Sequence, residues 1–392
     1  MQDRHGSRAE GPSGRGEGRP LHVMITANAA WNIWNFRRPI VESLLAAGHR
    51  VTIVAPVDEM LSKLQGLGCT VVPLKMDVRG LNPVADLALL WRFRAIFRQW
   101  RPDAVLSFTI KNNVFGGLAA RLAGVPFVPN VTGLGTAFLS GWLLQRVAET
   151  LYRAAFRALP VVFFENDDDG ALFEARGMLR PGQAWVLPGT GIDLIHYAAA
   201  PMPVHPPEAP VFLMVARLLR DKGVIEYVEA ARRIKAEYPQ TRFQLLGPAG
   251  VQNRTAIHLD EVQGWVEEGI IDYLGTRTDV RPVVQAADCV VLPSYREGAP
   301  RTLIEASAMA RPVIATDVAG CRAVVDADVT GFMCQPRDAA SLADAMRRFL
   351  CLSSQERADM GAAGRRKMER EFDEKLVLAA YHQALRDVTA RG

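Results

Sequence analysis

The sequence of 392 residues has no paired cysteines, no metal-binding histidine motif and no nucleotide-binding glycine motif. Its five cysteines never form a C-x-x-C pair, so neither a zinc site nor a disulfide framework is expected, and a reducing compartment fits best. The seven histidines show neither HxxxH nor HExxH spacing, and we predict no metal site. No GxGxxG or P-loop motif follows a predicted strand, which disfavours an NAD-dependent enzyme or a P-loop NTPase.

The chain also lacks the apolar segments that signal peptides and membrane spans require. Residues 1–20 are rich in Gly, Arg and Pro and nearly free of apolar side chains, so we interpret them as a disordered leader. Residues 122–145 carry no charge, but they contain prolines, glycines and polar groups that a spanning helix does not tolerate. We therefore expect that the chain does not cross a membrane.

What is present is an ordinary globular composition with an uneven distribution of charge. Hydrophobic residues make up 49% of the chain and charged residues 22%, and the length suits two domains that each bury a core. Residues 31–160 contain 15 Lys and Arg against 7 Asp and Glu, whereas residues 161–210 contain 2 against 7. The basic first half indicates an anionic partner, which is a membrane surface, a phosphorylated substrate or nucleic acid. Nucleic acid is set aside because no RNP, helix-turn-helix or zinc-finger pattern is present.

Short apolar runs alternate with longer amphipathic segments from Leu21 onward. This alternation predicts βαβ units and parallel sheets, and therefore an α/β protein. Five prolines within residues 201–210 interrupt the pattern and indicate a linker, after which strands and helices resume. We predict two tandem Rossmann-like domains facing a central cleft, over residues 21–200 and 211–373. Residues 374–392 are predicted as a C-terminal helix in position to cross back to the first domain.

Two cations follow the first predicted strand of the second domain. Arg217 and Lys222 stand five residues apart, and Gly223 then opens a helix. In open α/β sheets, ligands bind at the carboxyl ends of strands, where helix N-termini present N–H groups to anions. Arg offers a planar fork and Lys a point charge, so the pair suits a diphosphate. For this segment alone, a solvated charged turn is the alternative.

Two carboxylates lie eight residues apart after a later strand. Glu297 falls in the loop, and Glu305 falls about one turn into the next helix. Free N–H groups near Arg301–Leu303 can bind a phosphate at the start of that helix. A carboxylate accepts hydrogen bonds from vicinal hydroxyls, so one Glu could hold a ribose and the other a hexose. The alternative interpretation is that both glutamates are ordinary acids on a surface helix. A third turn, Asp317–Gly320, follows the next strand at the same sheet edge.

Several segments of the second half carry a resemblance to a known family. They are Ala216-Arg217-Leu218, Lys222-Gly223, Ser294–Gly298, Leu303–Ala306, PVIATDVAG and TGFMCQP. In order and at successive strand ends, they resemble glycosyltransferase family 4, whose members are retaining, nucleotide-sugar-dependent transferases with the GT-B fold. The resemblance runs from about Leu21 to the C-terminus and is strongest over residues 211–337. It implies Glu297, Arg217 and Lys222 as catalytic residues, and it adds as donor-binding residues Gly298, Arg301, Thr302, Leu303 and Glu305.

The roles of these residues follow from the same resemblance. Arg217 and Lys222 would contact the donor diphosphate, Glu297 would face the donor sugar, and Glu305 would face the ribose. Fixed cations and a helix N-terminus supply positive potential where charge develops on the leaving diphosphate, so no metal or further cofactor is expected. The first half shows no second carboxylate obviously placed at a strand end as a nucleophile, and the resemblance implies retention by attack on the same face.

Three segments of the first half resemble a bacterial subgroup of that family: Asn35–Pro39, Thr109–Asn113 and Thr132–Gly135. Subgroup members add a hexose or N-acetylhexosamine to polyprenyl-diphosphate-linked sugars in glycan, capsule or O-antigen assembly. The resemblance implies a UDP-sugar donor and an undecaprenyl-diphosphate-linked saccharide as acceptor. The implied acceptor-binding residues are Asn35, Arg37, Lys111, Asn112, Thr132 and Gly133.

Two segments depart from the family pattern. Asn28–Asn32 stands where many relatives have a glycine-rich loop, and Asn130–Gly133 lacks a histidine that many relatives carry there. The residue of the first domain that supports the acceptor hydroxyl is therefore not assigned. Asp167–Asp169 could be a metal-binding cluster, but these acids precede a helical pattern and we interpret them as capping that helix.

An anionic membrane surface is predicted as a partner, at the cytoplasmic face of the inner membrane. Residues 138–144 combine Phe, Trp and Leu before a basic segment, which suits the headgroup boundary, with a buried loop as the alternative. Residues 86–101 form a basic amphipathic pattern, for which we favour a sheet-packing helix whose arginines face water.

Two other functions stay open at this point. The same donor site could act on a soluble acceptor or serve a nucleotide-sugar epimerase, and such an enzyme should turn over donor without lipid. A non-catalytic membrane scaffold of a glycan assembly complex is the second alternative, although a scaffold has no physical need for the four donor-site residues.

Overall fold

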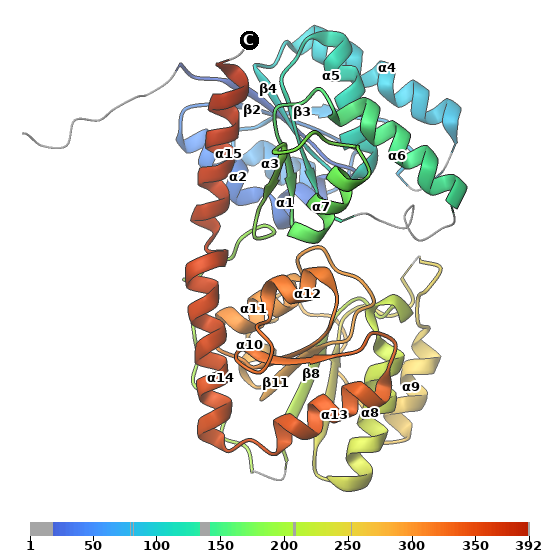
Figure 1. Ribbon diagram of the computed structural model, residues 1–392, viewed down its shortest axis with the longest axis vertical. Coiled ribbons are helices and arrows are strands. Elements are labelled where there is room, and N and C mark those ends of the chain that lie inside the picture. Colours follow the sequence, from blue (N-terminus) through green and yellow to red (C-terminus); the bar gives the residue numbers. More distant parts are fainter. Residues whose placement is uncertain are drawn as a thin grey trace, which may run out of the picture.

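The computed structural model describes residues 19–78, 80, 82–133, 142–206, 209–251 and 253–390. The chain forms two lobes, each built on a parallel sheet with helices packed against it (Figure 1). The predicted fold class, two tandem α/β domains, is confirmed. Most of the predicted leader, residues 1–18, lies outside the described residues.

The first sheet has seven parallel strands in the order β3-β2-β1-β4-β5-β6-β7. Its strands are β1 (His22–Thr26), β2 (Arg50–Ala55), β3 (Thr70–Pro73), β4 (Ala104–Phe108), β5 (Phe127–Val131), β6 (Val162–Phe164) and β7 (Ala184–Val186). Its helices are α1 (Ala30–Phe36), α2 (Arg38–Ala46), α3 (Met60–Gly66), α4 (Pro83–Trp100), the π-helix η1 (Asn112–Gly116), α5 (Gly117–Ala123), α6 (Trp142–Phe156) and α7 (Asp167–Ala175). The strand order reverses between β1 and β4, and ligands bind at such a switch point outside the carboxyl ends of the strands.

Apolar residues are buried on both faces of this sheet. Val23 and Ile25 of β1 join the cluster that includes residues of α1, α2 and α3, whereas Met24 joins the cluster that includes residues of α4 and α5. A strand buried on both faces favours a continuous apolar run, and all five residues of β1 are buried around the run Val23–Ile25.

The second sheet has six parallel strands in the order β10-β9-β8-β11-β12-β13. Its strands are β8 (Val211–Val215), β9 (Arg242–Leu246), β10 (Asp272–Tyr273), β11 (Cys289–Leu292), β12 (Val313–Thr316) and β13 (Gly331–Cys334). Its helices are η3 (Arg220–Lys222), α8 (Val224–Glu237), α9 (Leu259–Glu267), α10 (Arg281–Gln285), α11 (Arg301–Ala308), α12 (Ala319–Val324) and α13 (Ala339–Leu350). The short strands β3, β7, β10 and β13 are the edge strands of the two sheets.

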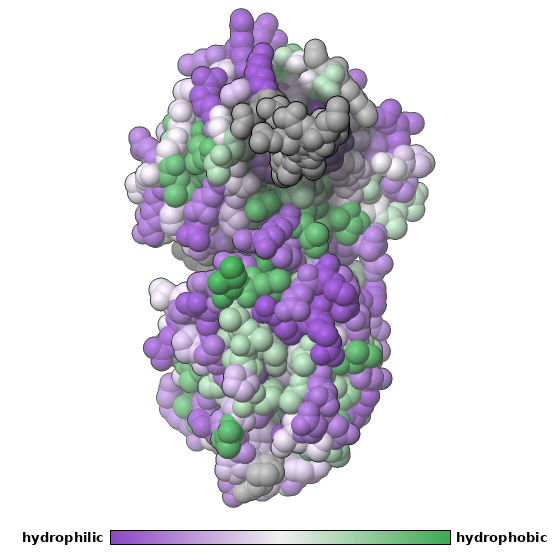
Figure 2. Space-filling model, turned by 90° about the vertical axis from the view of Figure 1, so that its left-hand side faces the viewer, coloured by the Kyte–Doolittle hydropathy of each residue, from purple (hydrophilic) through white to green (hydrophobic). Residues whose placement is uncertain are grey.

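The last helices connect the two lobes. α14 (Ser354–Lys367), η4 (Met368–Phe372) and α15 (Glu374–Thr389) follow one another along one side of the molecule, from the second domain to the first (Figure 1). Figure 2 views this side and shows two lobes that meet at a narrower waist. Two segments of the chain run side by side at the waist. The N–H of Ile192 in one segment donates to the carbonyl of Phe372 in the other at 2.8 Å.

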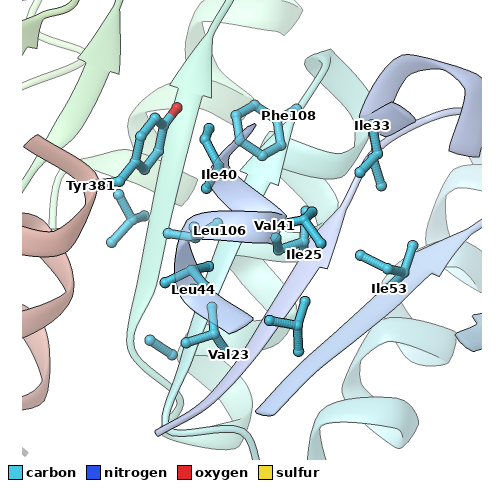
Figure 3. Packing of buried hydrophobic residues seen from close by; sticks show 14 of the residues in the cluster. Val23, Ile25, Ile33, Ile40, Val41, Leu44, Ile53, Leu106, Phe108 and Tyr381 are labelled. Carbon is cyan, nitrogen blue, oxygen red and sulfur yellow. The ribbon is translucent and has the colours of Figure 1, made fainter. Parts of the chain in front are cut away.

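α15 contributes to the core of the first domain. The buried ring of Tyr381 lies 4.8 Å from that of Phe163 and 6.1 Å from that of Phe108. Figure 3 shows Tyr381 reaching from its helix toward the side chains on the central strands. Its hydroxyl accepts a hydrogen bond from Nδ2 of Asn130 at 2.7 Å. The C-terminal segment therefore packs as part of the first domain.

No helix in the described ranges is long and apolar enough to cross a bilayer.

Candidate active site

A cavity of about 560 Å³ lies between the two domains. Its second-domain wall includes Val215, Leu246 and Leu292, which end three neighbouring strands, so the cavity lies at the carboxyl edge of that sheet. Its first-domain wall comes from α1 and from residues after β5 and β6. The sequence-predicted residues that line it are Arg37, Thr132, Arg217, Lys222, Glu297, Arg301, Thr302 and Glu305.

Arg217 and Lys222 reach the cavity from the loop that follows β8. Gly223 ends this loop with φ of 75°, and a Cβ there would lie 2.0 Å from the carbonyl oxygen of Pro293, so only glycine allows the turn. Nζ of Lys222 lies 2.5 Å from Oε1 of Glu297, which holds both side chains at the cavity wall. Arg217 is exposed, and its guanidinium forms no hydrogen bond or ion pair with any residue of the described ranges. It is therefore available to bind an anion.

The Glu297–Gly298 segment is wedged between α12 and the first domain. A Cβ at Gly298 would lie 2.7 Å from the carbonyl oxygen of Thr132 and 3.2 Å from Oε2 of Glu165. A Cβ at Gly320, in α12, would lie 2.3 Å from the carbonyl oxygen of Gly298. Both positions therefore require glycine. The predicted Asp317–Gly320 turn does not line the cavity; its Gly320 instead packs against the backbone of the Glu297–Gly298 loop.

Glu305 faces the cavity from α11 and is 9% exposed. Its Oε1 accepts hydrogen bonds from Nε of Arg301 at 2.6 Å and from the hydroxyl of Tyr197 at 2.9 Å. Arg301 also donates to Oγ1 of Thr190 at 2.9 Å. Burial and the neighbouring Glu305 raise the pKa of Tyr197 to about 12, so its hydroxyl remains a donor at neutral pH.

Two predicted donor-binding residues at the start of α11 are engaged elsewhere. The side chain of Leu303 is fully buried in the core, and its N–H donates to the carbonyl of Pro300 at 3.0 Å, so it is not a free donor for a ligand. Oγ1 of Thr302 donates to the carbonyl of Val215 at 3.0 Å, although the residue lines the cavity. Of the N–H groups that the sequence analysis expected to be free near Arg301–Leu303, only those of the first two residues remain candidates.

The first domain contributes a buried ion pair to the cavity wall. Glu165 follows β6 directly, and its Oε1 lies 3.1 Å from a terminal nitrogen of Arg37. The two side chains are 8% and 3% exposed. Burial raises the pKa of Glu165, although Arg37 opposes that change. The sequence analysis expected no carboxylate placed as a nucleophile at a strand end of the first half; Glu165 does stand at such an end, directly after β6, and its carboxylate is paired with Arg37.

A second cavity of about 480 Å³ adjoins the first through two shared lining residues, Thr132 and Arg217. Nζ of Lys111 lies 2.6 Å from Oδ1 of Asp86 at its edge. Thr109 also lines this cavity and has φ of 73°, which is strained for a β-branched residue. Strained backbone conformations of this kind cluster at functional sites. The predicted acceptor residues that line it are Lys111, Thr132 and Gly133.

Two predicted acceptor residues lie away from both cavities. Asn35 is exposed, and its Nδ2 donates to the carbonyl of Trp31 within the same helix at 2.8 Å. Asn112 is buried, and its Nδ2 donates to Oγ1 of Thr26 at 2.7 Å, so it braces η1 against β1. The polar character of the two asparagines did not show that their side chains point away from the cavities. The cavity-lining residues to which the sequence analysis gave no role include Trp31, Phe36, Glu165, Thr190, Thr276 and Arg277.

The acids Asp167–Asp169 occupy the first turn of α7, but the cap itself is Asn166, which accepts from the N–H of Asp169 at 2.9 Å. These acids also bridge the domains. Asp169 pairs with Arg296 at 3.1 Å and Asp168 pairs with Arg322 at 2.6 Å. In the part of the chain that the structure describes, no group of three or more His, Cys, Asp or Glu side chains could hold a metal ion.

Two family models match the chain, one on each domain. The glycosyl transferase 4-like domain matches residues 33–190, and the glycosyl transferases group 1 model matches residues 209–351. Together they cover more than half of the chain. The chain belongs to the group 1 glycosyltransferases, in agreement with the sequence resemblance.

Individual relatives of this glycosyltransferase share about a quarter of its residues. It is 27% identical over 345 residues to the N,N'-diacetylbacillosaminyl-diphospho-undecaprenol alpha-1,3-N-acetylgalactosaminyltransferase of Campylobacter jejuni, with 84% of this chain and 89% of that protein covered. It is 26% identical over 285 residues to the UDP-Gal:alpha-D-GlcNAc-diphosphoundecaprenol alpha-1,3-galactosyltransferase of Escherichia coli, with 69% and 72% covered.

A solved structure shares the fold over nearly the whole chain. Anabaena HepE in complex with UDP-glucose matches with a TM-score of 0.74 at 18% identity, and the match covers 94% of this chain and all of that one. The GT-B arrangement expected from the sequence is therefore confirmed.

Proposed function

We propose that this glycosyltransferase moves a hexose or N-acetylhexosamine from a UDP-sugar to a saccharide carried on undecaprenyl diphosphate. The transfer proceeds with retention and without a metal ion, in the synthesis of a bacterial surface polysaccharide or glycan. The observation that carries the proposal is the convergence of two cations and two carboxylates, Arg217, Lys222, Glu297 and Glu305, on one cavity. The names of the two relatives above both refer to a sugar linked to undecaprenol through diphosphate, and this supports a lipid-linked saccharide as the acceptor.

The donor fits the second-domain wall group by group. A volume of about 560 Å³ lies in the range of small-molecule sites, roughly 300–1,000 Å³. Glu305, fixed by two donors, accepts hydrogen bonds from the ribose hydroxyls, and Glu297 accepts them from the donor sugar. Arg217 and Lys222 bind the diphosphate between them. The apolar stretch for the base is lined by Leu246, Gly247, Pro248 and Val280.

The chemical step breaks the bond between C1 of the sugar and the diphosphate oxygen, and forms a bond between C1 and the acceptor oxygen. Negative charge develops on the departing diphosphate, where Arg217 and Lys222 stabilise it. One such fixed donor lowers a barrier by typically about 3 kcal/mol. Attack on the same face lets the leaving phosphate take the proton of the acceptor hydroxyl. Fixed cations make a metal unnecessary in this scheme.

The acceptor enters from the first domain and the membrane. The second cavity, with Lys111 and Thr132 in its wall, adjoins the donor site and takes the saccharide or its phosphates. α4 packs into the first-domain core through Leu89, Phe93 and Phe97, as the sequence predicted. Elsewhere on this helix Leu87 and Trp91 are 56% and 52% exposed, and Arg94 lies 5.3 Å from the Trp91 ring. Exposed Trp and Leu beside arginines suit the headgroup region of an anionic leaflet. We propose peripheral association at the cytoplasmic face of the inner membrane.

The other predicted membrane segment, residues 138–144, gives no further support. Residues 138–141 lie outside the described residues, and the side chains of 142–144 are not described.

A transfer assay tests this proposal. A panel of UDP-sugars with labelled sugar is incubated with the protein and a membrane lipid extract, with EDTA present throughout, and label in the chloroform-extractable fraction is counted. Transfer from one donor that is lost in Glu297→Ala supports the donor site, the acceptor class and metal independence together. Donor consumption without lipid product contradicts the lipid acceptor and favours a soluble acceptor or an epimerase.

Two further outcomes would contradict the proposal. No donor consumption at all would favour the scaffold alternative. In a parallel sedimentation experiment, absence of binding to anionic liposomes at low salt would overturn the membrane association.

A further inference from the structure

The ion pair between Glu165 and Arg37 occupies a costly position. Both side chains are buried at the wall of the cavity, and their closest atoms are 3.1 Å apart. Burying two charges costs desolvation energy that their attraction often fails to repay, so a pair of this kind is weak support for a purely stabilising role. Polar groups retained at a cavity wall instead indicate a task in that cavity.

The hydrogen-bonding capacity of the pair is not exhausted. Nε and one terminal nitrogen of Arg37 are buried without a partner among the residues that the structure describes. Only Oε1 of Glu165 has a hydrogen bond there, and Oε2 points toward Gly298. Since buried polar groups are nearly always paired, unpaired groups beside a cavity indicate a ligand that completes them.

Contacts across the cleft place Glu165 beside the donor-sugar end of the site. Its neighbour Asn166 donates from Nδ2 to the carbonyl of Gly298 at 3.1 Å. Oε2 of Glu165 lies 3.2 Å from the position that a Cβ of Gly298 would take, and Gly298 directly follows Glu297. The carboxylates of Glu165 and Glu297 are also close enough for Glu297 to help raise the pKa of Glu165. Two carboxylates from opposite domains therefore flank the same part of the cavity.

The register of the first sheet explains why Glu165 comes to this wall. β5 and β6 pair in parallel with Val131 opposite Phe164, so Thr132 and Glu165 leave the sheet side by side. Thr132 lines both cavities, and it stands in the segment that lacks the histidine found in many relatives. Glu165 thus offers a hydrogen-bonding group at the junction between donor and acceptor cavities.

We propose that Glu165 accepts a hydrogen bond from the attacking hydroxyl of the acceptor and directs its oxygen toward C1 of the donor sugar. Arg37 occupies Oε1 and leaves Oε2 to the substrate. No bond to Glu165 forms or breaks, and the proton of the hydroxyl still leaves with the departing phosphate. This inference rests on the proposed function and assigns the group that orients the acceptor.

The test separates acceptor orientation from donor binding. Glu165→Gln, Glu165→Asp and the exposed control Glu59→Gln are compared in two measurements. The first is transfer from labelled UDP-sugars to undecaprenyl-diphosphate-linked N-acetylhexosamine, and the second is the calorimetric Kd for UDP. We expect Glu165→Gln to lower kcat for transfer about 100-fold, as small misplacements of a reacting group do, with a Kd for UDP unchanged within about twofold. Glu165→Asp recovers part of the rate, and Glu59→Gln matches wild type.

A second variant guards against loss of folding. The double variant Arg37→Met/Glu165→Leu replaces the buried pair by apolar side chains, an exchange that proteins often tolerate. It should fold, bind UDP and fail to transfer. Transfer at the wild-type rate by either Glu165→Gln or the double variant would overturn the role of Glu165. Loss of UDP binding in parallel with transfer would also overturn it, because the effect would then lie on the donor.

The outcomes for wild type separate this inference from the function that it rests on. A wild-type protein that transfers only as fast as Glu165→Gln refutes the inference alone. A wild-type protein that transfers to no lipid-linked saccharide refutes the proposed function, and the inference with it.

Discussion

The two walls of the cavity are assembled from the chain in different ways. The second-domain wall uses short local segments, in which Arg217 and Lys222 share one loop, and Glu297 and Glu305 share one loop and helix. The first-domain wall joins Arg37 to Glu165, which are 128 residues apart. The wall that we assign to the donor is therefore built from segments close together in the sequence, whereas the wall that we assign to the acceptor forms only once the sheet brings distant residues together.

The largest expected effect falls on the local wall. Lys222→Ala removes a cation from the diphosphate and leaves Glu297 without its 2.5 Å partner. We expect kcat for transfer to fall about 100- to 1,000-fold, the usual effect of removing one fixed donor from a developing charge. The control is Lys235→Ala, a half-buried lysine of α8 that donates to the carbonyl of Gly269, away from the cavity. Equal activity of both variants would show that the local wall is not the donor site.

A smaller effect on the same wall concerns donor binding. Glu305→Ala removes the carboxylate that we assign to the ribose, and with it the acceptor for Nε of Arg301 and the hydroxyl of Tyr197. A hydrogen bond to a charged group contributes roughly 1.5–3 kcal/mol, so the Kd for UDP should rise at least about tenfold. Titration calorimetry measures this constant directly. If Glu305→Ala and Lys222→Ala both keep wild-type activity, the donor site is misassigned.

The link between the two walls can be broken at two ion pairs that differ in burial. Asp169 is 6% exposed and pairs with Arg296, next to Glu297, whereas Asp168 and Arg322 are both more than half exposed. In a double-mutant cycle, Asp169→Asn and Arg296→Gln should each lower transfer about fivefold, and the double variant should be no worse. The Asp168 and Arg322 cycle should show no measurable coupling, because exposed ion pairs contribute little. Equal coupling in both cycles would mean that burial does not matter here.

The smallest effect is a dependence of stability on pH. Burial raises the pKa of Glu165 above its ordinary value of 4.5, so the folded protein binds a proton at this carboxylate more tightly than the unfolded chain does. The stability that this provides is complete below the unfolded pKa and is lost as pH rises through the folded pKa, by about 1.4 kcal/mol for each pH unit between the two pKa values. Relative to Glu165→Gln, wild type should therefore lose thermal stability from pH 4.5 toward neutrality. A difference in Tm that does not change with pH would contradict this.

The convergence of the proposed donor residues on one cavity could be predicted because it follows from local rules. A strand, a short loop and a helix place their polar residues at the carboxyl edge of a parallel sheet, and this brought Arg217, Lys222, Glu297 and Glu305 to one cavity. The same rules do not say which N–H groups are already used. Leu303 was expected as a free donor, but the carbonyl of Pro300 accepts its N–H.

The positions of the proposed acceptor residues could be predicted only in part, because side-chain direction and strand neighbours are not local properties. Asn112 and Asn35 carry the expected amide groups, yet one braces β1 and the other bonds within its own helix. Glu165 stands at the end of a recognised strand, but its place in the cavity depends on β6 lying beside β5 and on contacts with Gly298. The ion pairs that Asp168 and Asp169 of α7 form with arginines of the second domain could likewise not be predicted, because they depend on how the two domains meet.

The proposed mechanism requires that residues of both domains meet on the donor sugar. A crystal structure of the intact chain with a bound UDP-sugar would show this arrangement. We expect the diphosphate within hydrogen-bonding distance of Arg217 and Lys222, the ribose at Glu305, and the sugar between Glu297 and Glu165. A diphosphate held away from both cations, or a sugar that turns away from Glu165, would contradict the mechanism.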